Sequence, residues 1–263
     1  TREGMSNDII LCMYEDSKHN MWFGTNGGGI TKFDGKNFYL ISQKQNLGNN
    51  TIRAIVEDRN GTMWFGTNGG GLDKFDGTSI THFTQREGMS DNFILCVMED
   101  SKGNLWVGSE SGGLTKIESD TIKHYNVENG LSNNNVWSVI EDLNNNLWVG
   151  TENGLNLITF GEDDEFQITT FGKLDGLKGV DFYPNSVCLD NENRLWWGSG
   201  KALTMLDLNK YEQIIKPPVI NITDIGIDQS YIDYRQLKDS VQKGYTVFLS
   251  ETSTVPLNYM VYD

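Results

Sequence analysis

One five-residue phrase recurs through the chain: MWFGT at residues 21–25, MWFGT at 63–67, LWVGS at 105–109, LWVGT at 147–151 and LWWGS at 195–199. The successive tryptophans of these phrases are 42, 42, 42 and 48 residues apart. A period of about 42 residues suits one four-stranded unit, which cannot bury both of its faces alone and must stack on copies of itself. The spacing therefore predicts a tandem repeat protein.

Each repeat is predicted to hold four short strands, and the second copy shows them most clearly. Its residues 51–57, 63–67, 72–76 and 79–84 are rich in β-branched and aromatic residues, and glycine, asparagine and aspartate separate them. Four strands of about five residues each make a meander, which is the blade of a propeller. We therefore predict an all-β fold in which residues 1–214 form five blades of a β-propeller.

The composition limits the possible partners. The 263 residues carry a formal net charge of −15 without any basic cluster, which disfavours nucleic acid and anionic lipid surfaces. No stretch holds the roughly 20 apolar residues that a membrane helix needs, so we expect no membrane segment in this sequence. The first residues show no signal peptide that would indicate a location.

An aspartate stands six residues before each tryptophan, at the start of the turn between the first two strands. Its carboxylate can accept hydrogen bonds from the backbone N–H groups that follow and so close the turn. Residues 142–146 resemble the opening of a calcium loop, but the glycine and the distal glutamate of such a loop are missing, so we expect no metal. We expect the tryptophans to pack blade on blade and not to serve as ligand platforms. The residues with this structural role are Trp22, Trp64, Trp106, Trp148, Trp196, Asp16, Asp58, Asp100, Asp142 and Asp190.

Candidate ligand-binding residues come from the first strand of each repeat. The positions seven and five residues before the aspartate vary between copies, whereas their neighbours stay aliphatic or small. Positions that the fold requires keep the same kind of residue in every repeat. The variable positions are therefore candidates for ligand recognition at the mouth of the propeller. Aromatic rings there would cover the apolar face of a sugar, and amides and a guanidinium would meet its hydroxyls. The candidates are Arg53, Phe93, Asn135, Trp137, Tyr183 and Asn185; the alternative is that they only fill the central channel.

An enzymatic function is less favoured by the sequence. The three histidines are expected in a hairpin turn and in outer strands, away from the mouth: His19, His82 and His124. Four carboxylates could supply an acid and a base, but on an acidic surface such groups are more often simply solvated: Asp91, Glu110, Glu152 and Asp181. We therefore expect no catalytic residue and no cofactor.

The spaced motif [IV]-x-x-[IVM]-x-E-D-x-x-[GN]-x-[LM]-W-[FV]-G-[TS]-x-x-G-G-[LI] resembles the two-component regulator propeller repeat. It is read at residues 52–72, 94–114 and, with one glycine fewer, 136–155. The resemblance implies a periplasmic sensor region of an inner-membrane protein that signals to a cytoplasmic histidine kinase. Propellers of that family usually have seven blades, so the resemblance also implies that the five repeats are part of a larger propeller.

The segment at residues 216–235 resembles the opening of the immunoglobulin-like sandwich that follows such propellers. Pro217 and Pro218 cannot donate ladder hydrogen bonds, which favours an extended linker before a new β-rich unit. We therefore predict two domains, with propeller blades at residues 1–214 and the truncated start of the sandwich at 215–263.

Three functions follow, in order of preference. The first is an extracytoplasmic sensor domain that recognises an oligosaccharide or another small extracellular ligand. The second is a protein-interaction scaffold that forms a homodimer in the full-length sensor. The third is a propeller hydrolase or lyase.

Overall fold

The computed structural model describes residues 4–119, 121–161, 165–200 and 202–211, and the strands at 225–227, 230–232, 245–249 and 258–262. The chain divides into two compact units, Thr1–Tyr211 and Glu212–Asp263. Among the described residues there is no helix long and apolar enough to span a membrane.

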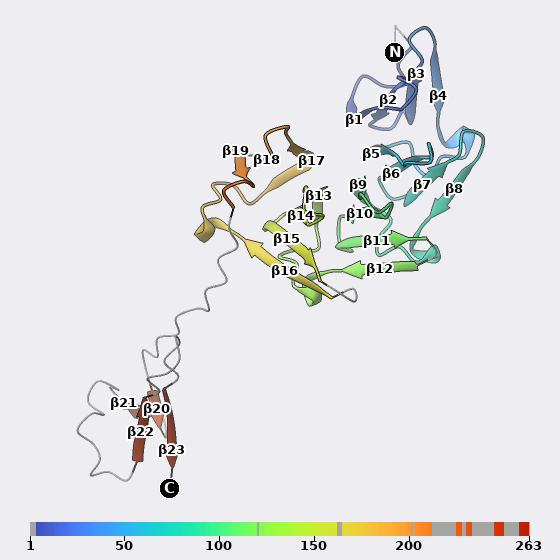
Figure 1. The fold of residues 1–263 in the computed structure, drawn as a ribbon. Coiled ribbons are helices and arrows are strands. Elements are labelled where there is room, and N and C mark those ends of the chain that lie inside the picture. Colours follow the sequence, from blue (N-terminus) through green and yellow to red (C-terminus); the bar gives the residue numbers. More distant parts are fainter. Residues whose placement is uncertain are drawn as a thin grey trace. The chain divides into compact units, whose positions relative to one another are not determined.

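The first unit consists of five antiparallel sheets whose strands pair in sequence order (Figure 1). The first sheet holds β1 (Ile10–Glu15), β2 (Met21–Thr25), β3 (Ile30–Phe33) and β4 (Phe38–Ile41), and the second holds β5 (Ile52–Glu57), β6 (Met63–Thr67), β7 (Leu72–Phe75) and β8 (Ile80–Phe83). The third holds β9 (Ile94–Glu99), β10 (Leu105–Ser109), β11 (Leu114–Glu118) and β12 (Thr121–Tyr125). The fourth holds β13 (Val136–Glu141), β14 (Leu147–Thr151), β15 (Gly154–Phe160) and β16 (Phe166–Phe171), and the fifth holds β17 (Phe182–Leu189), β18 (Arg194–Ser199) and β19 (Leu203–Asp207).

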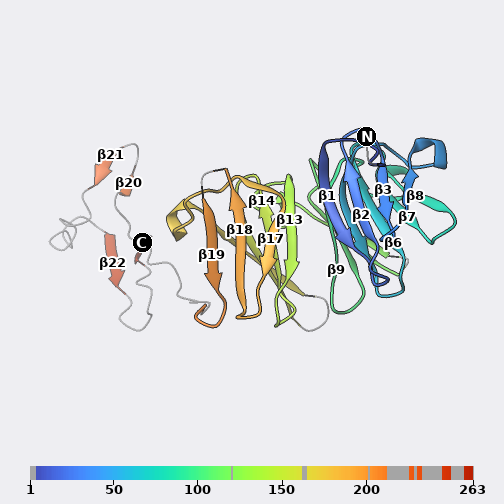
Figure 2. The ribbon, with the colours of Figure 1, turned by 90° about the horizontal axis from the view of Figure 1, so that it is seen from above.

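These sheets are the blades of a β-propeller, as the repeat predicts. The first strands β1, β5, β9, β13 and β17 lie innermost, and β4, β8, β12 and β16 lie at the outer edge (Figure 1). In Figure 2 the strands within a blade lie side by side, β1 to β3 in the first blade and β17 to β19 in the fifth. Four blades have the predicted four strands, whereas the described part of the fifth blade has three. The fourth strand predicted for that blade lies outside the described residues.

The spacing of six residues between aspartate and tryptophan has a direct structural cause. In each blade one carboxylate oxygen accepts the backbone N–H groups two and four residues further on, which closes the turn. The other oxygen accepts the indole Nε1–H of the tryptophan. The five Nε1 to Oδ2 distances, in chain order, are 2.8, 2.9, 2.8, 3.0 and 2.9 Å. Sequence reasoning predicted the turn but missed the indole hydrogen bond.

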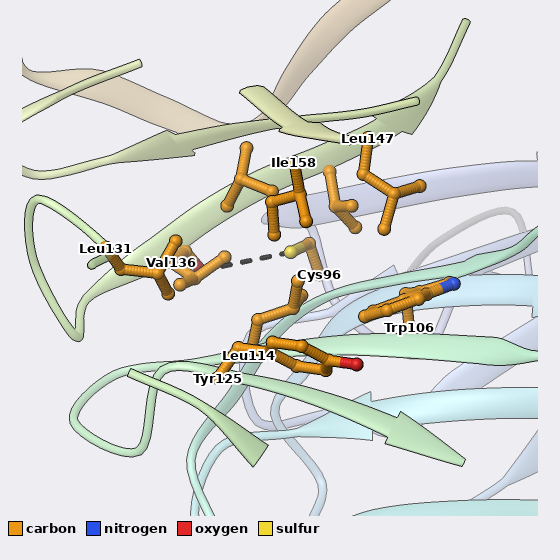
Figure 3. Close-up of a cluster of buried hydrophobic side chains, with 10 residues drawn as sticks. Cys96, Trp106, Leu114, Tyr125, Leu131, Val136, Leu147 and Ile158 are labelled. Carbon is orange, nitrogen blue, oxygen red and sulfur yellow. Dashed lines mark hydrogen bonds between the residues drawn. The ribbon is translucent and has the colours of Figure 1, made fainter. Parts of the chain in front are cut away.

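The hydrophobic core is divided into four clusters, one at each junction between successive blades. Figure 3 shows the cluster between the third and the fourth blade. Trp106 and Leu114 of the third blade are 1% and 0% exposed, and they pack against Val136, Leu147 and Ile158 of the fourth. The tryptophan of one blade therefore supports the next blade as well as its own turn.

A polar contact reinforces the first three junctions. In each of them, a glutamate at the end of a blade's first strand accepts hydrogen bonds. The donor is the residue directly after the recurring aspartate of the preceding blade. Ser101 N and Oγ, for example, lie 2.6 and 2.8 Å from the carboxylate oxygens of Glu141. Ser17 contacts Glu57 in the same way, and Arg59 contacts Glu99. At the fourth junction leucines occupy these two positions, Leu143 and Leu189.

The second unit has two antiparallel strand pairs among its described residues. β20 (Ile225–Ile227) pairs with β21 (Ser230–Ile232), and β22 (Tyr245–Leu249) pairs with β23 (Asn258–Tyr262). The predicted linker at Pro217 and Pro218 lies outside the described residues. The sandwich and the domain boundary after residue 214 therefore stay predictions.

Candidate functional site

Two sets of loops meet on one face of the propeller, which we call the loop face. The loop between the second and third strands of a blade donates a hydrogen bond to the loop that leads into the following blade. Gly71 N, for example, lies 2.9 Å from Asn92 O, and Gly113 N lies 2.9 Å from Asn134 O. Gly71 has a φ of +83°, and a Cβ there would meet the carbonyl oxygen of Phe83, so glycine is required at this close approach. The backbone thus holds the loops of successive blades together around the mouth.

Arg53 and Phe93 come together on this face through a shared neighbour, Asn68. Arg53 is half-buried on β5, and its Nε donates to Asn68 Oδ1 at 3.0 Å. The backbone of Asn68 forms an antiparallel bridge with Phe93, which precedes β9. The Phe93 ring is 41% exposed and lies beside Gly69. Asn68 therefore contacts both the guanidinium of Arg53 and the backbone of Phe93.

A bulge in β17 brings Asn185 toward the same place. Phe182 pairs with Ser199 and Val187 pairs with Trp197, so five residues on β17 span the space of two on β18. Asn185 lies in this bulge with a φ of +52°, a left-handed conformation that asparagine tolerates well. Its Nδ2 donates to Arg53 O at 2.8 Å and to the carbonyl oxygen of β9 residue Leu95 at 3.2 Å. The bulge thus ties the fifth blade to the second and third.

The other candidates lie on the fourth and fifth blades. Asn135 Nδ2 donates to Glu152 Oε2 at 3.0 Å, while its Oδ1 is buried with no hydrogen-bond partner among the described residues. Trp137 is half-buried on β13, and Tyr183 is exposed in the β17 bulge. The contacts of the described residues thus join Arg53, Phe93 and Asn185, whereas Asn135 makes a separate pair with Glu152.

A cavity of about 380 Å³ opens between the innermost strands. β1 contributes Ile10 to Met13, β5 contributes Ala54 and Ile55, β9 contributes Val97, and the bulge contributes Pro184 and Asn185. Asn185 is the one candidate residue that lines it, and its amide is already used between two strands. For Asn185 the structure therefore favours the alternative in which the side chain fills the channel.

Sequence reasoning did not choose Asn68, and it weighed Glu152 only as a possible acid or base; in the structure they bond to Arg53 and Asn135. Both directly follow a recurring tryptophan phrase, where the chain has Asn26, Asn68, Glu110 and Glu152. This position also varies between repeats, although less than the chosen ones do, so the same comparison of repeats could have found it.

Several of the titratable groups that sequence reasoning weighed for catalysis make structural contacts. Asp91 is buried and accepts Ser111 N and Oγ at 2.9 and 2.7 Å. His82 lies 2.6 Å from the buried carboxylate of Asp73, between strands β7 and β8. Among the described residues, no group of three or more His, Cys, Asp or Glu side chains is arranged to hold a metal ion. The side chains joined at the mouth suit hydrogen bonding and ring contact.

The architecture and the repeated Asp–Trp pair define a β-propeller repeat protein. Four segments, residues 4–27, 46–69, 88–111 and 130–153, match the family model described as two component regulator propeller. The chain therefore contains two-component regulator propeller repeats, which confirms the resemblance seen in the motif. Each matched segment runs from the loop that leads into a blade to two residues beyond the tryptophan phrase, so it includes one whole loop of the loop face.

Solved structures show the same fold. The extracellular domain of a hybrid two-component system from B. thetaiotaomicron has a TM-score of 0.73 and 20% identity, over 96% of this chain and 38% of its own. The extracellular domain of a second such system from that organism has a TM-score of 0.62 and 22% identity, over 79% of this chain and 30% of its own. A virginiamycin B lyase from Staphylococcus aureus has a TM-score of 0.58 and 17% identity, over 76% of this chain and 71% of its own. None of the curated proteins matches the chain in sequence.

Proposed function

We propose that this chain is the ligand-sensing part of an extracytoplasmic two-component sensor and that it signals to a cytoplasmic histidine kinase. The repeat family supports the sensor role. Two of the similar folds are extracellular domains of hybrid two-component systems, which supports a place outside the cytoplasm, in the periplasm of a bacterium with an inner-membrane sensor.

The proposed ligand is an oligosaccharide, bound at the loop face. The observation that carries this proposal is the joining of Arg53, Asn68 and Phe93. The exposed ring of Phe93 would cover the apolar face of a sugar, and the guanidinium of Arg53, fixed through Nε, would donate to its hydroxyls. The net charge of −15 disfavours acidic sugars, so the ligand is neutral or cationic.

Calorimetry of the whole chain against a panel of neutral and amino-bearing oligosaccharides tests this proposal. Phe93→Ala and Trp137→Ala should each weaken binding by roughly 1–3 kcal/mol, because an aromatic contact is lost at the mouth while the core is retained. Phe166→Ala is the matched control, since Phe166 is 39% exposed against 41% for Phe93 but lies on the outer strand β16. It should leave the affinity unchanged.

Two results would contradict the proposal. Equal affinity in the parent, Phe93→Ala and Trp137→Ala would move the site away from the loop face. Turnover of a glycan that disappears in Asp181→Asn or Glu152→Gln would make the chain an enzyme, because these carboxylates could act as acid and base.

We also propose that residues 215–263 begin an immunoglobulin-like sandwich. The two strand pairs of the second unit support a β-rich unit that folds apart from the blades. Amide hydrogen exchange of the whole chain provides the test. In the destabilised variant Trp106→Ala the blade amides should exchange faster while those of β20 to β23 keep their rates, and a common change in both units would contradict the proposal.

A further inference from the structure

A cavity opens between the first and second blades on the face opposite the loop face. The strands of a blade run up and down in order, so the turns after the first and third strands share this opposite face. The cavity has a volume of about 270 Å³, whereas the corresponding cavity at the third junction, where Phe160 packs on Trp106, has about 60 Å³. We call the larger cavity the junction groove. Its walls include Lys18, Lys32, Tyr39, Ile41, Glu57 and Phe75, all from the first two blades.

An aromatic ring that packs in the next three blades is missing beside this groove. In those blades the outer-strand residue at one position is Phe83, Tyr125 or Phe171. Each of these rings packs on the tryptophan of its own blade, with ring centroids 5.6, 5.5 and 5.8 Å apart. In the first blade the same position holds Ile41, which lines the groove. The groove therefore opens where the repeat otherwise places a ring.

A long side chain is also missing at the groove. At the second junction Arg59 follows the recurring aspartate, and a Cβ built on Gly103 would lie 2.9 Å from its Cζ, so the guanidinium covers that turn. At the first junction the corresponding residue is Ser17. A Cβ built on Gly61, the counterpart of Gly103, would meet only Glu57 Oε1, at 3.7 Å. The short serine thus leaves the space over the turn of the second blade open.

Two lysines bring hydrogen-bond donors to the groove. Lys32 Nζ lies 5.1 Å from the centroid of the Trp22 ring. Neither Lys32 nor Lys18 makes an ion pair with another residue in the described part of the chain, whereas the equivalent Lys116 pairs with Glu118 at 2.8 Å. The two ammonium groups are therefore available to a ligand that accepts hydrogen bonds.

The two carboxylates that line the groove already have donors. Asp16 accepts the indole N–H of Trp22 and backbone N–H groups of its own turn. Glu57 accepts the backbone N–H and the hydroxyl of Ser17. A molecule in the groove therefore meets apolar walls and unpaired donors, which together suit an aromatic ring with an anionic group.

We propose that the junction groove binds a small carboxylic acid that carries one aromatic ring. The ring would lie against Tyr39, Ile41 and Phe75, in the space that a protein ring fills in the following blades. The carboxylate would accept charge-assisted hydrogen bonds from Lys18 and Lys32. Pockets for drug-sized ligands have roughly 300–1,000 Å³, so the volume of this groove fits a molecule with a single ring.

The acidic character of the chain does not prevent this binding. At physiological salt, exposed charges are screened beyond about 8 Å, so the lysines in the groove act more strongly on the ligand than distant acidic residues do. This inference concerns a second site, and it does not depend on the ligand proposed for the loop face.

Calorimetry of the whole chain with phenylpropionate tests the proposal. The acid should bind in the millimolar range or more tightly, and added salt should weaken the binding because the ion pairs are partly exposed to water. Phenylpropanol has the same ring without the charge, and butyrate has the charge without the ring. Each should bind at least roughly tenfold more weakly than phenylpropionate, because one of the two interactions is lost.

Two variants test the place of binding. Lys32→Gln removes one ammonium group and should weaken binding roughly tenfold. Ile41→Phe adds the ring that the following blades have, and it should abolish binding because the ring occupies the groove. Lys74→Gln is the matched control, since Lys74 lies 5.3 Å from the Trp64 ring centroid in the second blade but does not line the groove, and its affinity should equal that of the parent.

Three results would overturn the proposal. The parent may fail to bind phenylpropionate, or Lys32→Gln and Ile41→Phe, shown by circular dichroism to be folded, may bind it as the parent does. Tighter binding of a peptide that ends in phenylalanine than of the free acid would make a peptide end, and not a small molecule, the ligand of the groove.

Discussion

The junction between the third and fourth blades and the face of the fifth blade that points away from the fourth use the same positions of the repeat in different surroundings. Trp106 and Trp196 bind their aspartates at 2.8 and 2.9 Å, so the turn is formed with or without a following blade. Leu114 is buried and Leu203 is exposed, although each is paired with the glycine of its own phrase. The comparison teaches that each blade organises its own turn, whereas burial of its apolar face depends on the neighbour.

Replacing the junction tryptophan should show the largest difference. Trp106→Ala removes a large buried ring and should lower the free energy of unfolding by roughly 3–5 kcal/mol, whereas Trp196→Ala should cost less than half as much. Denaturant unfolding followed by circular dichroism measures both. A loss below about 1 kcal/mol for Trp106→Ala would show that this ring does not hold the junction.

The paired leucines give the next contrast. Leu114→Ala opens a cavity in a packed cluster and should cost roughly 2–5 kcal/mol, whereas Leu203→Ala should stay within about 0.5 kcal/mol of the parent in dilute solution. The same unfolding measurement compares the two variants. Equal costs would mean that Leu203 is covered in solution.

The polar contact should contribute less. Glu141→Ala removes the acceptor of two hydrogen bonds from Ser101 and should cost about 1 kcal/mol, since the contact is exposed to water. Glu15→Ala is the matched control, because Glu15 holds the same position without a preceding blade, and its change should be close to zero. If Glu15→Ala costs as much as Glu141→Ala, the glutamate acts within its own blade.

Acid should weaken the junction between the third and fourth blades through Asp100. Burial raises the pKa of Asp100, but hydrogen bonds from Trp106, Asn104 and the turn backbone outweigh it, so the pKa lies below its ordinary value. A folded pKa below the unfolded one contributes stability above the unfolded value of about 3.9, and this stability is lost as the pH falls through the folded pKa. Unfolding measured from about pH 6 to about pH 3 should show a smaller loss in Asp100→Asn than in the parent. Identical pH dependence in the two proteins would contradict this assignment.

The sequence predicts most of the fold because the same local pattern of turn and strand residues recurs in five repeats. The tryptophan period specified the blades, and the aspartate specified the turn. The exposure of Leu203 could not be predicted in this way, since in sequence it is equivalent to the buried Leu114. What distinguishes them is a neighbouring blade, which no local pattern encodes.

The candidate site was predictable only in part. Variation between repeats pointed to Arg53 and Phe93, which the structure joins through Asn68. The position of the Asn185 side chain depends on the bulge, in which five residues of β17 span the space of two on β18. It also depends on hydrogen bonds to carbonyl groups 90 and 132 residues away in the chain. Neither the bulge nor these distant partners leaves a periodic signal.

The bulge of β17 also bears on how the propeller comes apart. A stack in which each blade contacts only its neighbours behaves as a one-dimensional series, so an end blade can fray while the others stay folded. Asn185 interrupts that series, because it binds the carbonyl groups of Arg53 and Leu95 in the second and third blades. The fifth blade therefore cannot unfold without breaking this contact. Forming the contact joins segments far apart in the chain, which makes it a late step of folding. A single asparagine thus couples the unfolding of the fifth blade to the second and third blades.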